Sequence, residues 1–152
     1  MKWLVLIHIL TAIIGVGPTF FGHVLVRKNQ SVGDLKQSLK LSKMLEFFPK
    51  IGGSIAVLTG LLLVILYDYT FSAFWIYASL ILYVLIQVVV IGIVAPQTKK
   101  LNAWSSQTSL SDSEALPAET ASILKKSETF YTVASAMGVL LFALMILKPV
   151  LG

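Results

Sequence analysis

Hydrophobic residues dominate four stretches of this chain, and more polar stretches separate them. The four apolar runs cover residues 3–26, 49–67, 71–96 and 127–148. A transmembrane helix needs about 20 mostly apolar residues to cross a hydrocarbon core about 30 Å thick, and each run is close to or above that length. The pattern therefore predicts an all-α polytopic membrane protein, in which residues 1–152 form a single domain built as an antiparallel four-transmembrane-helix bundle.

The first run contains no Asp, Glu, Lys or Arg, yet it holds both histidines of the protein, His8 and His23. On a helical wheel its polar and small residues share one side, within roughly 120° of arc. These residues are His8, Thr11, Ala12, Gly15, Thr19, Gly22 and His23. A polar side of a helix in lipid is expected to face the other helices. Because the run is longer than a signal-peptide core and no Ala-x-Ala cleavage site follows, we interpret it as a retained span.

Small residues recur along the second run, where Gly52, Ala56 and Gly60 follow one another at every fourth position. This small-xxx-small pattern lets membrane helices approach closely, so it predicts a packing face. The connection that follows, residues 68–70, is the shortest in the chain. It predicts that the second and third spans form an antiparallel hairpin.

Polar side chains also mark one face of the third and fourth runs. In the third run the face consists of Ser72, Ser79, Tyr83 and Gln87. Gln87 lies near the middle of the membrane, where an unpaired amide is costly, so we expect it to hydrogen-bond another helix. In the fourth run the shared face consists of Glu128, Tyr131, Ser135, Gly138 and Phe142, with Met145 at its edge.

The two longer polar segments contain helix signals of their own. Ser31 followed by Asp34 resembles a capping box, and the lysines and leucines that follow fall on different parts of a helical wheel. This pattern predicts an amphipathic helix at the membrane surface. Residues 113–117 resemble a helix start that continues into the fourth span, whereas Pro96 favours an end of the third. We therefore expect amphipathic loop helices between the spans.

Lysine and arginine are concentrated in these two segments, with six in residues 27–50 and four in residues 97–127, and the short middle connection has none. The positive-inside rule places both basic segments in the cytoplasm and both termini outside, in the cell (plasma) membrane. The net charge of +5 also suits nucleic acid. However, the basic residues flank apolar spans and no nucleic-acid motif accompanies them, so the lipid bilayer and its anionic headgroups are the expected partner.

Motifs of common enzyme classes are absent: the sequence has no P-loop, nucleophile elbow, zinc-protease motif or dinucleotide fingerprint. The chain also has no cysteine, which excludes disulfides, thiolate metal sites and cysteine-ligated clusters. An imidazole in a helical bundle is a natural haem ligand, and a methionine at similar depth completes a His/Met pair. We therefore hypothesise that His8 and Met145 bind haem b. Three residues are expected to line this pocket: Tyr83, Gln87 and Ser135.

Structural alternatives apply to both histidines. His8 can hydrogen-bond a neighbouring helix without binding a cofactor, and His23 can pair with Glu128 or with lipid headgroups at the cytoplasmic boundary.

Short motifs also resemble those of known membrane proteins. They are the early histidine, Ala95-Pro96 before Lys99-Lys100-Leu101, and the sequence Met-Ile-Leu-Lys-Pro at residues 145–149. In these features the chain resembles a family of small bacterial four-helix membrane proteins, similar to HemJ-type protoporphyrinogen oxidases and the membrane part of CopD-type copper proteins. The resemblance implies haem on the first-helix histidine, which His8 matches. The lysine of the HemJ-type third helix is missing from residues 69–97, so protoporphyrinogen oxidation is not implied.

Three functional interpretations stay open. The first is a redox or haem-handling membrane protein centred on His8. The second is a non-catalytic accessory or assembly subunit, whose small-residue faces dock onto a second copy or a larger membrane complex. The third is a small transporter, for copper if the CopD resemblance holds. It ranks last because the four methionines are scattered along the chain.

Overall fold

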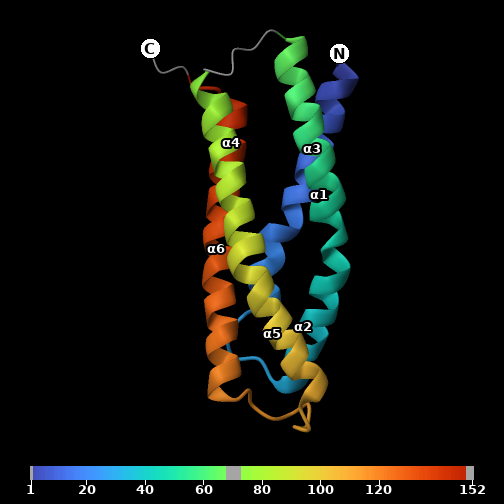
Figure 1. Cartoon of the computed structure of the whole chain (residues 1–152), viewed down its shortest axis with the longest axis vertical. Helices are drawn as coiled ribbons and strands as arrows, with labels where there is room; N and C mark the ends of the chain where they lie inside the picture. The colour runs from blue at the N-terminus through green and yellow to red at the C-terminus, as the bar shows by residue number, and fades with distance from the viewer. Residues whose placement is uncertain (1, 68–72, 150–152) are drawn as a thin grey trace.

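The computed structural model describes residues 2–67 and 73–149, and within these ranges helices are the only extended regular elements (Figure 1). In chain order they are α1 (Lys2–Leu25), α2 (Val32–Leu45), α3 (Phe47–Leu66), α4 (Phe74–Gln87), the π-helix η1 (Val88–Val94), α5 (Ala95–Gln107) and α6 (Ala118–Leu147). Four continuous helical stretches in the described ranges are long and apolar enough to cross a membrane. The predicted all-α, four-span architecture is therefore confirmed. The predicted hairpin connection at residues 68–70, and Ser72, lie outside the described residues. The helices on either side of it, α3 and α4, have no Cα atoms within 8 Å of each other in the described ranges, so the predicted packing of the second span against the third is not observed.

The four stretches pack as two helix pairs rather than as one evenly packed bundle (Figure 1). α1 lies against α3, and α4 lies against α6. In the described ranges no Cα atom of α4 lies within 8 Å of a Cα atom of α1 or α3. α1 also contacts α6, where Phe20 and Phe142 stack with ring centroids 6.2 Å apart. α1 therefore holds the two pairs together.

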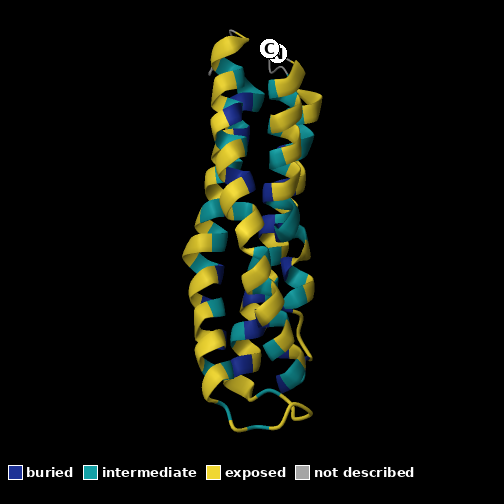
Figure 2. Cartoon of the chain, turned by 90° about the vertical axis from the view of Figure 1, so that its right-hand side faces the viewer, coloured by how far each residue is buried: buried dark blue, intermediate teal, exposed yellow. Residues whose placement is uncertain are grey.

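α2 and α5 contact each other at the end of the bundle that carries both long polar segments, which we call the basic end. α1 begins and α6 ends at the opposite end (Figure 1). Many residues along the spans are exposed (Figure 2), and the exposed residues include many large apolar ones. Such a surface suits a lipid environment, because large contiguous apolar areas are rare on soluble monomers.

Glycines allow the backbones of α1 and α3 to touch. A Cβ placed on Gly15 would collide with the backbone nitrogen of Gly53 and would lie 2.7 Å from the carbonyl carbon of Gly52. Gly15, Thr19 and Gly22 are the buried residues of α1. The predicted packing faces of the first two spans are therefore confirmed, and they pack mainly against each other.

The most completely buried side chains lie at the basic end. Val26, Leu35, Leu39, Leu101 and Leu124 form one hydrophobic cluster, and none of them is more than 3% exposed. Val26 directly follows α1, and the other four come from α2, α5 and α6. The polar segments thus fold into a small helical core of their own, continuous with the spans.

The structure confirms the predicted helix after Ser31 and shows what its leucines contact. Ser31 caps α2 through the predicted capping box, accepting a hydrogen bond from the Asp34 amide at 3.2 Å. However, α2 leads into α3 with only Glu46 between them, and Glu46 keeps helical dihedral angles of −58° and −23°. Leu35 and Leu39 pack in the cluster at the basic end rather than against lipid. A leucine face buried by protein and one buried by lipid have the same sequence period, so the sequence pattern alone does not say which of the two covers Leu35 and Leu39.

Pro96 does not end the helix that begins at Phe74, because the chain continues through it to Gln107. The reason is the π-helix η1, in which the Ala95 N–H donates to the carbonyl of Val90, five residues earlier. In a regular α-helix a proline ring clashes with the carbonyl four residues before it. A wider turn relieves this clash, so the helix can pass the proline.

The connection between α5 and α6 is fastened to the start of α2. The amides of Val32 and Gly33 donate to the carbonyls of Glu114 and Asp112, both at 3.0 Å, and Lys36 pairs with Asp112 at 2.8 Å. The exposed Glu114 carboxylate accepts the Ser111 amide at 2.7 Å, which lowers the pKa of this carboxyl. These contacts fix the connection against the helices at the basic end.

Candidate functional site

His8 lies in the first half of α1 and faces α3. Its Nδ1 is 2.9 Å from the carbonyl oxygen of Ala56 and 3.1 Å from Oγ1 of Thr59. A carbonyl oxygen can only accept a hydrogen bond, so Nδ1 carries the proton and donates it to Ala56. Nε2 then keeps the lone pair that a metal ligand requires. No described residue hydrogen-bonds to Nε2.

The neighbours of His8 on α3 hold the ring in place. Thr59 donates its hydroxyl hydrogen to the carbonyl of Ile55 at 2.7 Å, which leaves its oxygen free to accept from His8. A Cβ placed on Gly60 would lie 3.0 Å from Cε1 of His8, so the ring rests directly on this glycine. In metalloproteins a ligating histidine almost always donates its second ring nitrogen to a carbonyl, a carboxylate or water. The surroundings of His8 reproduce that arrangement.

Met145 packs within the other helix pair. It lies against a cluster formed by Ile86, Ala134 and Leu141, on α4 and α6. Figure 1 shows the C-terminal end of α6 beside α4 and the N-terminal end of α1 beside α3. The packing partners found for Met145 thus come from a different helix pair from those of His8.

Ser135 and Tyr83 lie where the two pairs meet. The Ser135 hydroxyl can donate to the carbonyl of Thr19 on α1 at 3.1 Å and to that of Tyr131 on its own helix at 2.8 Å. A methyl group at Gly53 would lie 3.6 Å from the Tyr83 hydroxyl oxygen, so Tyr83 reaches from α4 toward α3. Thr19 is about 16 Å along α1 from the level of His8, at 1.5 Å per residue. Ser135 thus lies nearer the middle of the bundle than His8, which is closer to the end where α1 begins.

The side-chain amide of Gln87 and the ring of His23 have no hydrogen-bond partner among the described residues. Gln87 is half-buried at the last position of α4, and its expected bond to another helix is not found in the described ranges. His23 is half-buried, and its Nδ1 is fully buried without a partner there. No ion pair between His23 and Glu128 is present in the described part of the chain.

The sequence predicts the histidine but not the groups that hold it. Ala56 and Gly60 were predicted chiefly as packing residues, and the acceptor on Ala56 is a backbone carbonyl, which has no sequence signature. Across the described ranges no group of three or more His, Asp or Glu side chains could hold a metal ion.

The fold defines the class of this protein, which is a small polytopic integral membrane protein with four helical spans. A family model described as "Predicted integral membrane protein (DUF2269)" matches residues 2–149. The chain belongs to this DUF2269 family. Comparison with curated proteins and with solved structures gives no match, so neither supports the resemblance to HemJ-type or CopD-type proteins.

Proposed function

We propose that this protein binds a b-type haem through Nε2 of His8 and has a redox or haem-handling role in the membrane. The observation that carries the proposal is the 2.9 Å hydrogen bond from Nδ1 of His8 to the Ala56 carbonyl. This bond selects the tautomer that presents Nε2, and an imidazole nitrogen is the commonest protein ligand of haem iron. A bound haem supplies one-electron chemistry. The chain's own contribution is to orient the ligand through Ala56, Thr59 and Gly60.

Met145 is the candidate for a second residue that would hold the haem. Its packing against α4 and α6 favours a haem held by His8 alone, with Met145 in the neighbouring helix pair. A haem that His8 alone would hold differs in its absorption spectrum from one that His8 and Met145 would hold together. Met145→Leu is therefore expected to leave the spectrum unchanged.

Removal of the His8 imidazole is expected to abolish haem binding. The wild-type protein, expressed with haem supplied and purified in detergent, should show a Soret band, and His8→Ala should lack it. His23→Ala is the matched control, because it removes the other histidine of the same helix. Thr59→Val keeps the side-chain shape but removes one acceptor of the Nδ1 proton, and we expect about a tenfold loss of haem affinity. A wild-type protein without a Soret band, or a His8→Ala variant that keeps it, rules out the proposal.

We propose further that the protein lies in the cell membrane with both termini outside and the basic end in the cytoplasm. The support is the clustering of lysines in the segments at the basic end, together with the positive-inside rule.

Because the natural chain has no cysteine, single-cysteine variants can test this orientation directly. A membrane-impermeant maleimide is expected to label Lys2→Cys in intact cells and Ser109→Cys only after permeabilisation. Both positions are exposed, so a failure to react reports the membrane side rather than burial. The reverse labelling pattern would establish the opposite orientation.

A further inference from the structure

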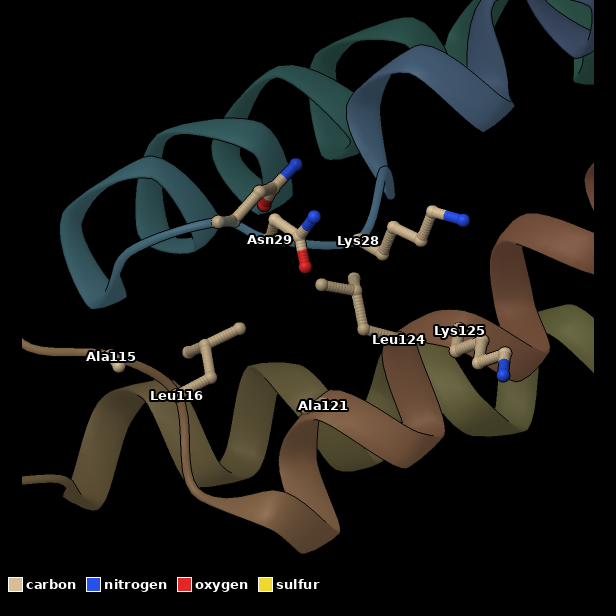
Figure 3. Close-up of a pocket in the computed structure, with 8 residues that line it drawn as sticks. Lys28, Asn29, Ala115, Leu116, Ala121, Leu124 and Lys125 are labelled. Carbon is tan, nitrogen blue, oxygen red and sulfur yellow. The ribbon is translucent and has the colours of Figure 1, made fainter.

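A pocket of about 410 Å³ lies at the basic end, between the α1–α2 connection and the first turns of α6 (Figure 3). Lys28, Asn29 and Gln30 line it on the side of the connection, and Leu124 and Lys125 line it from α6. Lys28 and Lys125 lie on opposite walls (Figure 3). The pocket therefore combines two cations with amide groups and an apolar surface.

The pocket lies where a span gives way to the polar segments. α1 ends at Leu25, shortly before Lys28, and Lys125 lies two residues before the fourth apolar run. At this level the hydrocarbon core meets the headgroups. A ligand in the pocket can therefore come from the aqueous phase or from the lipid layer.

The charge of the pocket is uncompensated in the described part of the chain. Neither Lys28 nor Lys125 forms an ion pair with a described residue, and no acidic residue lines the pocket. Two lysines that line one pocket attract anions to it, and basic pockets between helices on the cytoplasmic side are typical lipid-headgroup sites. The pocket thus favours a phosphate.

The buried amide of Gln30 adds a second, independent requirement for the ligand of this pocket. The residue is only 4% exposed, and its Nε2 donates to the carbonyl of Leu25 at 2.7 Å. This bond fixes the amide orientation, because a carbonyl cannot donate to the amide oxygen. Oε1 of Gln30 is buried and has no partner among the described residues. Buried acceptors are normally paired, so Gln30 calls for a ligand that brings an N–H or O–H group.

We propose that this pocket binds a phosphate ester with a hydrogen-bond donor next to the phosphate. The phosphate lies between Lys28 and Lys125, and the donor, an ammonium or a hydroxyl, bonds to Oε1 of Gln30. Phosphatidylethanolamine and phosphatidylglycerol headgroups have this chemistry, as do soluble phosphoethanolamine and glycerol phosphate. Phosphatidylcholine is the discriminating probe, because its headgroup has the phosphate but no N–H or O–H group. This site is independent of the haem proposal.

Native mass spectrometry of the full chain in detergent tests the proposal by titration with each of the three lipids. Phosphatidylethanolamine and phosphatidylglycerol are expected to bind about fivefold more tightly than phosphatidylcholine, the effect of one hydrogen bond. Lys28→Gln combined with Lys125→Gln is expected to weaken binding of both lipids about tenfold or more. Lys99→Gln combined with Lys100→Gln removes the same charge from exposed positions of α5 and should leave binding unchanged.

Gln30→Met tests the donor requirement and should remove the preference over phosphatidylcholine. This variant also loses the bond to Leu25, so its thermal stability is measured in parallel. The two double lysine variants test the site while Gln30 and this bond stay unchanged. Displacement of lipid by soluble phosphoethanolamine or glycerol phosphate would identify a soluble ligand, and failure to displace would identify the lipid. Equal binding of all three lipids, or equal losses in the two double lysine variants, would overturn the proposal.

Discussion

Gly15→Ala is expected to destabilise the folded protein by about 3 kcal/mol, through separation of α1 from α3. The new Cβ collides with the backbone nitrogen of Gly53 and lies 2.7 Å from the carbonyl carbon of Gly52. These are backbone atoms, so no side-chain rotation can relieve the overlap, and the two helices must move apart. In lipid this change is costly, because close backbone contact is a main source of attraction between membrane helices.

Gly17→Ala is the matched control for this prediction. A Cβ on Gly17 meets no atom within 4 Å, although the residue lies on the same helix only two positions away. Alanine is a better helix former than glycine by about 1 kcal/mol, so this variant should be as stable as the wild type or more stable. Thermal melting in detergent, followed by size-exclusion chromatography, measures both. If the two variants melt together, the α1–α3 contact is not the one described.

Gly15 also bears on the proposed haem site. His8 reaches Ala56 and Thr59 only because α1 and α3 are in backbone contact one to two turns away. A separation at Gly15 should therefore lengthen the bond that fixes the histidine tautomer. If the haem proposal holds, Gly15→Ala should lose haem even in detergent conditions where it remains helical.

The spans and their packing faces could be predicted because the bilayer restricts the choice. A membrane span must be helical and apolar, and its small residues have few uses other than close packing. This is why Gly15 and Gly52 were recognised from their spacing alone. The capping box at Ser31 was likewise readable, since it is a local interaction of neighbouring residues.

Lateral arrangement could not be predicted in the same way. Topology placed His8 and Met145 at similar depth, but depth does not determine which helices are neighbours, and the structure packs these residues in different helix pairs. Pro96 was expected to end a helix, because a wider turn before it has no clear sequence signature. The pocket at Gln30 depends on a connection and a helix start that are far apart in the chain. Only the folded structure brings them together.

Leu35→Ala is expected to cost about 3 kcal/mol of stability, because it leaves a cavity in the hydrophobic cluster at the basic end. Leu35 is fully buried there, together with Leu124 from α6. Leu41→Ala on the same helix is the control, since Leu41 is 42% exposed and should cost about 1 kcal/mol or less. If α2 instead lay flat on the membrane, both leucines would face lipid and the two substitutions would cost about the same.

A double-mutant cycle with Leu124→Ala sharpens this test. Residues that share a cavity show coupling of about 0.5–3 kcal/mol, whereas independent sites add. We therefore expect Leu35→Ala and Leu124→Ala to be non-additive, and Leu41→Ala and Leu124→Ala to be additive. Chemical denaturation in detergent, followed by tryptophan fluorescence, can report the result, because Trp104 packs against this cluster. Additivity in both pairs would mean that α2 does not share a core with α6, and that the proposed phosphate pocket beside Leu124 lacks the rigid wall it requires.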